Sequence, residues 1–447
     1  MTSRAPAPPS LRPATFINRG SALARLARPL AQFMRIEAGG GILLVVATVV
    51  ALVWANSPWS AAYHSLWETP IRIDVGSWRF AEDLQHVVND ALMAVFFFVV
   101  GLEIKRELVV GELRDRRQVA LPAFAAVGGM VVPALIFVAF NAGGPGSRGW
   151  GIPMATDIAF AVGVMAVLGR RVPAPLKVFL LTLAIADDLG AIAVIAIFYS
   201  DGLQLQYLLV AAGIAAVVAA MRRLHVAYPP VFVIAGIALW VVIFESGIHA
   251  TIAGVVMGLL TPARPLQDEL TAESVVDALE NRAELTTEDI RATAAAIRES
   301  VSVCDRLIEL LHPWTSYLIV PVFALANAGI ALDANPLDES SIFLGVLLGL
   351  VVGKTVGITA FGWLATRARL ASLPPGVTWG HFAAAGMLAG IGFTVSLFIT
   401  SLALPDEALA EPAKVAILLA SVLAAVAGSA LFVALARGRG APDDDVA

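Results

Sequence analysis

The segment Leu180–Tyr199, LLTLAIADDLGAIAVIAIFY, is apolar almost throughout, yet it carries two adjacent aspartates at its centre, Asp187 and Asp188. A run of about 20 apolar residues is long enough to cross the hydrocarbon core of a bilayer as a helix. A carboxylate at the centre of such a helix costs at least about 2.5 kcal/mol, so it is retained where it faces a cavity, a partner or an ion. The fold must therefore bring compensating groups to these two acids inside a membrane.

The composition agrees with a membrane protein that crosses the bilayer many times. Of the 447 residues, 58% are hydrophobic and 15% are charged, whereas soluble domains carry about 25% charged residues. The sequence predicts an all-α, multi-spanning membrane protein with about twelve transmembrane helices. The predicted spans are 38–56, 84–106, 119–140, 150–169, 176–200, 203–220, 227–244, 247–262, 313–332, 340–366, 379–404 and 413–436.

Lysine and arginine are distributed unevenly over the predicted loops. If the N-terminus is cytoplasmic, twenty lysines and arginines lie on the cytoplasmic side, and this number leaves out the loop after span eight. The external side then has only Arg72, Arg79 and Arg148. An excess of this kind marks cytoplasmic loops, so both termini are predicted to be cytoplasmic. The predicted organisation is a cytoplasmic tail at 1–35, a membrane domain at 36–437 and a cytoplasmic tail at 438–447.

Two connections between spans are unusual. Thr69–Trp78, TPIRIDVGSW, alternates β-branched with polar residues and turns at Gly76, which predicts a short external β-hairpin or an extended segment. The inside loop 263–312 is acidic and rich in alanine and glutamate, and it predicts two short amphipathic helices. This loop is either a solvated spacer or a regulatory or partner-binding element.

Five ionisable side chains lie well within the predicted spans: Asp90, Asp157, Asp187, Asp188 and Lys354. Asp157, Asp187 and Lys354 are 9, 10 and 13 residues from the nearest charge that flanks each span, which at about 1.5 Å per residue places all three near mid-membrane. The last four residues are therefore predicted to share one site, unless each is a satisfied packing residue. Asp90 is predicted to be a residue of the outer mouth or a capping residue.

Two spans contain residues that break helices. Span four begins GIPMATDIAFAVG, with Pro153 just before Thr156 and Asp157, and span eleven has three glycines in GMLAGIGFTVS. Such interruptions predict discontinuous helices whose free backbone ends line a cavity, although the glycines of span eleven are also compatible with close packing. We expect Asp157 to offset the positive N-termini of the half-helices, and Lys354 to offset their negative C-termini.

The ligand chemistry of this set favours a hard cation. Carboxylates and a threonine hydroxyl are oxygen ligands, and the sequence shows no cluster of histidine and cysteine with transition-metal spacing. His249 stands alone in a span and is expected to be a hydrogen-bonded packing residue. A cation and protons would compete for the same carboxylate oxygens, and this competition is itself an exchange mechanism. Lys354 would pair with one carboxylate in one state and release it in another.

Several motifs resemble those of the NhaA-type Na⁺/H⁺ antiporters, in order over residues 30–436. They are NDALMAVFFFVVGLEIKRELVVGEL, ATDIAFAVGVMAVLG, LTLAIADDLGAIAVIAIFY, SGIHATIAG, HPWTSYLIVPVFALANAG, GKTVGI and GMLAGIGFT. The resemblance implies inverted repeats and two discontinuous helices. It also implies that Asp188 is the main cation-binding carboxylate and that Asp187, which can pair with Lys354, carries a proton. Both would hold Na⁺, while Thr156 and Asp157 would support the site electrostatically.

The resemblance further concerns Glu103, Arg106 and Glu107, which share one helical face at the cytoplasmic end of span two. It implies a role in pH sensing or gating, and the alternative is a salt-bridged helix end. The external hairpin occupies the place of a dimerisation element, so a homodimer is expected. The loop 263–312 is longer than is usual in the family, so regulation through that loop is not carried over.

The resulting hypothesis is a secondary transporter in a bacterial inner membrane that exports Na⁺, and Li⁺, in exchange for external H⁺. Transport is expected to be electrogenic, to be activated as pH rises and to contribute to sodium and pH homeostasis. No enzymatic activity, cofactor or nucleic-acid partner is expected, since Na⁺ or Li⁺ and H⁺ are the cargo. Two alternatives are a sodium-coupled symporter of an organic solute and an intramembrane aspartyl protease, whose usual Gly-x-Gly-Asp pattern is absent.

Overall fold

The computed structural model of the chain describes most of the predicted membrane domain. The described residues are 39–75, 78–111, 116–200, 202–224, 229–265, 299–330 and 340–437, with residues 286, 291 and 294. The two predicted tails and most of the loop 263–312 lie outside the described residues, so those predictions remain untested.

The described chain is helical apart from one pair of strands. The first part forms α2 (Gly39–Ala55), α3 (Ser60–Trp67), β1 (Pro70–Val75), β2 (Trp78–Asp83), α4 (Leu84–Val87), the π-helical turn η1 (Val88–Leu92) and α5 (Met93–Val109). The middle part forms α6 (Arg116–Asn141), the 3-10 helix η3 (Pro145–Met154), α7 (Ile158–Leu168), η4 (Gly169–Arg171), α8 (Ala174–Phe198), α9 (Leu205–Arg223), α10 (Pro229–Glu245) and α11 (Thr251–Leu260). The last part forms α14 (Val303–Trp314), η5 (Thr315–Ile319), α15 (Val320–Asn327), α16 (Ser340–Leu348), η6 (Gly349–Gly353), α17 (Lys354–Arg367), α18 (Trp379–Leu388), α19 (Phe393–Ala403) and α20 (Glu407–Arg437).

These helices account for all twelve predicted stretches. Within the described residues, seven helical segments are long and apolar enough to cross a membrane, or ten when each sharply bent pair is counted as one span. Two further apolar helices, α10 and α11, are shorter. The structure thus shows a helical protein with many membrane-spanning candidates, and a total of twelve crossings remains a prediction.

The breaks in spans four and eleven are present. Between η3 and α7 the chain bends by 42°, and between α18 and α19 it bends by 50°. A third bend, of 116°, separates α2 from α3 at Asn56–Trp59, which contains Pro58, just after the predicted end of span one at 56. Helix α3 itself was not predicted. That bend ends the first span at Ala55 and turns α3 towards the hairpin.

Two predicted boundaries were wrong. The hairpin is longer than Thr69–Trp78, since β1 pairs antiparallel with β2 from Pro70 opposite Asp83 to Val75 opposite Trp78. Span nine begins at Val303 and not at 313. The first ten residues of this helix include the charged residues Asp305, Arg306 and Glu309, so their sequence does not predict a transmembrane segment. On the apolar face of the same turns, Cys304 and Ile308 are buried against α5.

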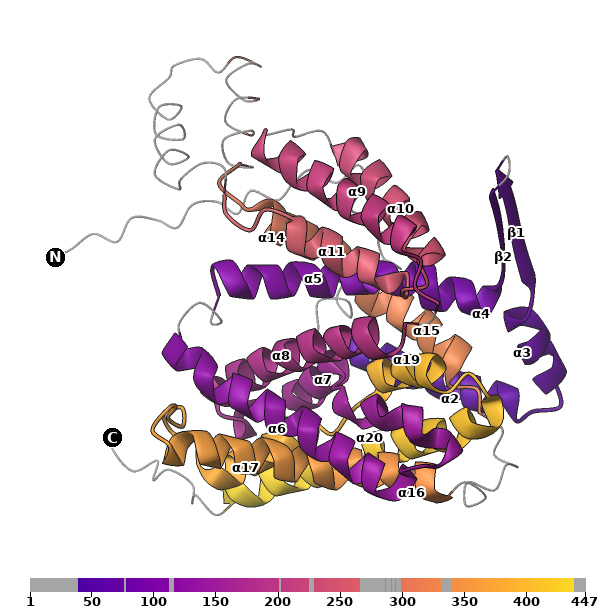
Figure 1. Cartoon of the computed structure of the whole chain (residues 1–447). Coiled ribbons are helices and arrows are strands. Elements are labelled where there is room, and N and C mark those ends of the chain that lie inside the picture. The colour runs from indigo at the N-terminus through magenta and orange to yellow at the C-terminus, as the bar shows by residue number, and fades with distance from the viewer. Residues whose placement is uncertain are drawn as a thin grey trace, which may run out of the picture.

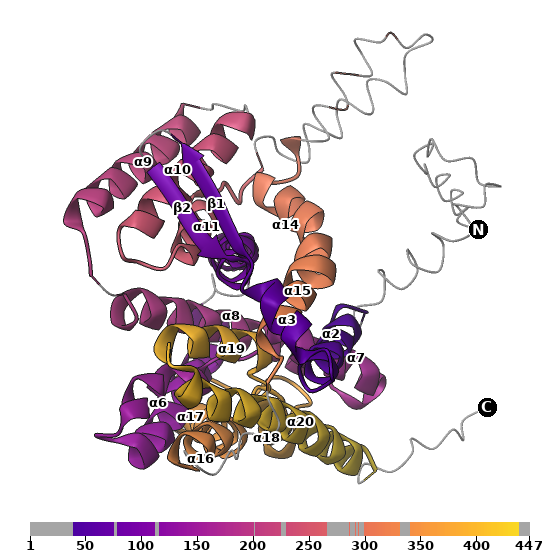
Figure 2. The same ribbon diagram turned by 90° about the vertical axis from the view of Figure 1, so that its right-hand side faces the viewer.

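The helices form two groups (Figure 1). One contains α6, α8, α16, α17, α18 and α20, which pack against one another, and the other contains α5, α9, α10, α11 and α14. Helices α9, α10 and α11 share a small hydrophobic cluster separate from the main core. The hairpin lies at one end of the helices and over the second group (Figure 2), where the Phe80 ring of β2 contacts Trp240 of α10. We call this the hairpin end.

The close packing of α6 against α17 depends on two facing glycines. A Cβ added to Gly128 would collide with the carbonyl oxygen of Gly357, and a Cβ added to Gly357 would collide with that of Gly128. Small residues let helix backbones approach closely in a membrane, where no hydrophobic force drives helices together. This contact holds α17, which begins at Lys354, against α6.

Replacing Gly357 by Ala should therefore destabilise the protein by about 1–3 kcal/mol, because the added methyl group has no space. Gly213 of α9 is the matched control, since a Cβ there meets nothing within 4 Å and Ala favours a helix over Gly. Thermal unfolding of the two purified variants in detergent checks this. A Gly357→Ala protein that unfolds at the same temperature as Gly213→Ala would contradict the steric argument.

Candidate functional site

The two interrupted helices cross at their breaks. The backbone N–H of Asp157 donates to the carbonyl of Ile391 at 2.7 Å, and the Thr156 hydroxyl lies 2.8 Å from the carbonyl of Ala389. A Cβ on Gly390 would lie 2.5 Å from the carbonyl oxygen of Leu350 in η6, so glycine lets the second break lie close to η6. The crossing places four half-helix ends together inside the membrane domain, as the sequence predicts.

Asp157 caps the N-termini of both half-helices that leave the crossing. Its Oδ1 accepts from the N–H of Phe160 in α7 at 2.9 Å. Its Oδ2 accepts from the N–H of Thr394 in α19 at 3.1 Å and from the Thr394 hydroxyl at 2.6 Å. A carboxylate at a helix N-terminus is stabilised by the exposed N–H groups and the helix dipole. Asp157 therefore offsets two helix starts, as predicted.

Lys354 forms a buried ion pair with Asp187. Its ammonium donates to Asp187 Oδ2 and, at 3.0 Å, to the Thr156 hydroxyl. The side chains of Lys354 and Asp187 are both completely buried. Lys354 was expected to offset the C-termini of the half-helices. It makes no direct contact with the Ala389 carbonyl, because the ammonium binds the Thr156 hydroxyl and that hydroxyl binds the carbonyl. A carboxylate can compensate the charge of the ammonium fully, which a carbonyl dipole cannot.

Asp188 is buried without such a partner. Its Oδ1 is buried and makes no hydrogen bond with any described residue, and the same is true of Asp187 Oδ1. The charges that act most strongly on Asp188 are those of three other carboxylates, Asp187, Glu103 and Asp157, and that of Lys354. Buried acceptors without a donor are costly, so these two oxygens are suited to receive a proton or a cation.

The donor set of the site consists of oxygen atoms. Among the described residues, no group of three or more His, Cys, Asp or Glu side chains is placed to hold a metal ion. An alkali metal ion at Asp188 would therefore also need hydroxyl, carbonyl or water oxygens, as hard cations accept. His249 does not belong to the site, and its Nε2 makes a hydrogen bond with the Tyr199 carbonyl at 2.9 Å, in line with the packing role expected for it.

Glu103, Arg106 and Glu107 lie together near the end of α5. Arg106 forms an ion pair with Glu107 at 3.4 Å and also interacts electrostatically with Glu103. This contact is the one that a salt-bridged helix end requires, and a role in pH sensing remains a prediction. Glu103 is also one of the carboxylates whose charge acts on Asp188.

Asp90 lies outside the central site. It belongs to the π-helical turn η1, and its carbonyl accepts from the indole N–H of Trp240 at 3.1 Å. Its charged neighbours are His86 and Glu82, near the hairpin. The structure therefore places Asp90 at the hairpin end and leaves its role as an outer-mouth residue a prediction.

Thr394 is a site residue that the sequence analysis missed. It holds Asp157 through two hydrogen bonds and is the second residue of α19, just after the break. The signal was present, because Thr394 follows the glycines of span eleven much as Thr156 follows Pro153 in span four. The carbonyls of Ala389 and Ile391 were also missed, since backbone acceptors carry no mark in a sequence.

Comparison with known proteins places these motifs in one family. The family model described as Na⁺/H⁺ antiporter 1 matches residues 31–432. The chain is 47% identical to the Na(+)/H(+) antiporter NhaA of Rhodopirellula baltica, over 92% of this chain and 94% of that protein. It is 48% identical to the Na(+)/H(+) antiporter NhaA 2 of Myxococcus xanthus, over 93% of this chain and 90% of that protein.

The Lys354–Asp187 pair yields a stability prediction. Replacing Lys354 by Met leaves a buried carboxylate uncompensated and should cost about 3–5 kcal/mol. The double variant Lys354→Met with Asp187→Asn contains two neutral groups and should recover a large part of that loss. Thermal unfolding of wild type, both single variants and the double variant at one pH gives the coupling between the two sites. Strictly additive effects would show that the two side chains do not stabilise each other.

Proposed function

The chain belongs to the Na⁺/H⁺ antiporter 1 family, and from this membership we propose that it is a secondary transporter that exchanges Na⁺ for H⁺ across a membrane. The relatives in Rhodopirellula baltica and Myxococcus xanthus are both named Na(+)/H(+) antiporters, and they are similar to this chain over nearly its whole length. In the direction that we propose, Na⁺ or Li⁺ leaves the cell and H⁺ enters, driven by the proton gradient.

The single observation that carries the mechanism is the unequal environment of the two adjacent aspartates. Each aspartate has a buried Oδ1 without a donor in the described chain, but only Asp187 is paired with a cation, Lys354, among the described residues. We assign cation binding to Asp188, with Asp187 turning towards the ion when Lys354 releases it. Protons and Na⁺ then compete for the same oxygens. Na⁺ displaces one proton from Asp188, and the second proton is the one held by the Lys354–Asp187 pair, which leaves when Asp187 turns to the ion. Two H⁺ are then exchanged for one Na⁺, so net charge moves in each cycle and exchange is electrogenic.

The surroundings of the site fit this proposal. The crossing of two broken helices places backbone ends and the Thr156 hydroxyl beside the aspartates, where oxygen ligands for a hard cation are available. Asp90 near the hairpin would attract cations at the outer mouth. The excess of lysine and arginine supports cytoplasmic termini in a bacterial inner membrane, and the hairpin is the surface that we propose for homodimer formation.

The first test uses purified protein in liposomes with an imposed pH gradient. Adding Na⁺ should dissipate the gradient, and Asp188→Asn should abolish this effect because the amide cannot carry the negative charge that holds the ion. Asp83→Asn is the control, since Asp83 caps α4 and the amide oxygen preserves that cap.

The same experiment separates the proposal from its rival. Gradient dissipation that requires an organic solute as well as Na⁺ would favour the symporter. A wild-type protein whose liposomes keep their pH gradient when Na⁺ is added would refute exchange.

A second test concerns the pH dependence. Exchange should rise with pH, because fewer protons compete with Na⁺ for the carboxylates and the apparent KM for Na⁺ falls. If the cluster near the end of α5 senses pH, Glu103→Gln and Glu107→Gln should shift the pH profile while the maximal rate is preserved. If the cluster is only a salt-bridged helix end, the variants should unfold at lower temperature and keep the wild-type profile.

A further inference from the structure

Three turns of the described chain are wider than the α-helices that contain them. They are η1, η5 and η6, and each lies inside a helix that is long and apolar enough to cross the membrane. In each turn a backbone N–H donates to the carbonyl five residues earlier, whereas an α-helix joins groups four residues apart. Each turn therefore contains one residue more than an α-helical turn. Turns of this π-helical kind are rare and often lie at functional sites.

The turn η6 ends at the lysine of the ion site. The N–H that closes it belongs to Lys354 and donates to the carbonyl of Gly349. A Cβ on Gly349 would lie 2.8 Å from the Cβ of Pro153 in η3, and a Cβ on Gly353 would lie 2.9 Å from the Cα of Pro133 in α6. The extra residue is thus packed closely between two neighbouring segments, directly before the ion-paired side chain.

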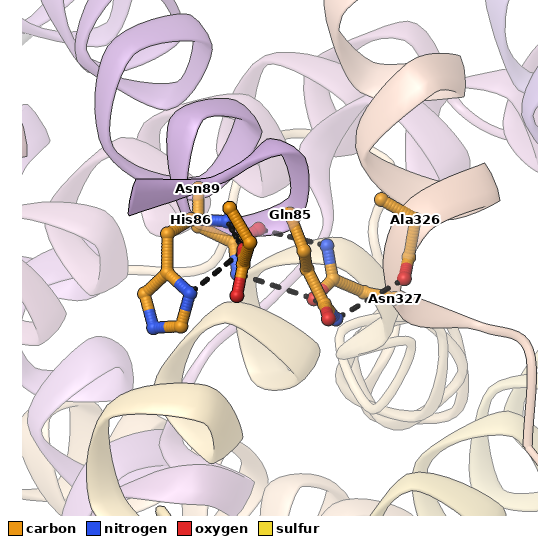
Figure 3. A network of polar contacts seen from close by, with 6 residues as sticks. Gln85, His86, Asn89, Ala326 and Asn327 are labelled. Carbon is orange, nitrogen blue, oxygen red and sulfur yellow. Dashed lines mark hydrogen bonds and ion pairs between the residues drawn. The ribbon is translucent and has the colours of Figure 1, made fainter. Parts of the chain in front are cut away.

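The turn η1 shows how such an extra residue can be fixed in place (Figure 3). Its Asn89 accepts from Asn327 Nδ2 of α15 at 2.8 Å and donates to Asn327 Oδ1 at 3.3 Å. Gln85, one turn earlier, donates to the same Asn327 Oδ1 at 3.2 Å. The turn η1 cannot shift along its helix without breaking these bonds. The residues of η6, GLVVG, have no polar side chain, so no side-chain hydrogen bond fixes this turn.

A shift of η6 along its helix has a defined geometric result. If the wide turn moved past Lys354, the α-helix would continue unbroken from Gly349, and Gly353 would be its fourth residue. Gly353 would then take the place that Lys354 has now. Lys354 would take the place of Thr355, about 100° around the helix axis. The helix before the turn and the helix beyond it would keep their orientations.

The place of Thr355 offers the displaced lysine a partner. Residues four apart in a helix lie on the same face, so Thr359 lies on the face of Thr355. The Thr359 hydroxyl is buried and has no hydrogen-bond partner in the described chain. A buried hydroxyl without a partner is costly, and the Lys354–Asp187 pair makes no use of it. An amine in the place of Thr355 would supply the missing partner.

We propose that η6 releases Lys354 from Asp187, because its extra residue can move past the lysine and turn the amine from the aspartate to the Thr359 hydroxyl. This proposal rests on the proposed function, in which Asp187 turns to the ion when Lys354 releases it. The ion then balances the charge of Asp187, and the proton of the pair leaves, so no unpaired charge stays buried. The neighbouring helices need not move in this step.

Deleting Val352 tests the extra residue. In that variant the Lys354 N–H and the Gly349 carbonyl are four residues apart, which is α-helical spacing, so the ion pair with Asp187 should still form. Val352 is 44% exposed, so its loss removes little core packing. Lys354 can no longer turn away, and Na⁺-dependent dissipation of a pH gradient in liposomes should be abolished. Na⁺ added to the purified variant should release at most one proton per ion, whereas wild type should release two.

The matched control is a deletion in η5. Leu318 is 47% exposed, and its deletion brings the Val320 N–H and the Thr315 carbonyl to α-helical spacing in the same way. No ionisable residue of the ion site follows this turn, since the next residue is Val320. The Leu318 deletion should therefore exchange Na⁺ for H⁺ at the wild-type rate.

The substitution Thr359→Val tests the partner of the released amine. Valine has nearly the shape of threonine, and the hydroxyl that it removes has no partner, so the unfolding temperature should not fall. The maximal exchange rate should fall about threefold to tenfold, the effect of one hydrogen bond lost in the released state. Thr366→Val is the control on the same helix, because the Thr366 hydroxyl only donates to the Trp363 carbonyl in an exposed turn. It should keep the wild-type rate.

Three results would overturn the proposal. They are a wild-type rate in the Val352 deletion, an equal loss of exchange in the Leu318 deletion, and a wild-type rate in Thr359→Val. If the Val352 deletion does not fold, Thr359→Val and its control decide. Wild-type protein is measured in parallel, and its failure to exchange Na⁺ for H⁺ would refute the proposed function itself.

Discussion

The Asp157 carboxylate at the crossing of two broken helices is the interaction on which the remaining structure of the site depends. Each half-helix start exposes N–H groups that no backbone carbonyl satisfies, and in a membrane water does not reach them freely. One carboxylate with two oxygens serves both α7 and α19. Without it, two positive helix ends would face each other, and the breaks that free the backbone around Thr156 and Ala389 would not be stable.

Charge compensation then divides the two neighbouring aspartates into different environments. The side chains of adjacent helical residues point about 100° apart, so a single lysine from α17 reaches Asp187 and leaves Asp188 facing other carboxylates. A site with one permanent cation and several carboxylates has an excess of negative charge when the carboxylates are ionised. It binds protons or a monovalent cation, which balance that negative charge.

Much of the fold was predictable from particular residues. Pro153 and the glycines of span eleven marked both breaks at the crossing, because proline lacks an N–H and glycine permits close backbone approach. The start of α14 was missed because Asp305, Arg306 and Glu309 conceal an apolar face that only its contact with α5 reveals. Thr394 was missed because a threonine gains its role only through its partner Asp157.

The sequence by itself determined that the chain is a membrane protein, where its apolar helices lie and which charges are placed at mid-depth, because the length and polarity of a segment are local properties. Only the tertiary structure decided which aspartate Lys354 would neutralise and which helix ends Asp157 would cap. These outcomes depend on distances between residues far apart in the chain. In a medium of low dielectric constant, such distances decide which charges are paired and which remain available to an ion.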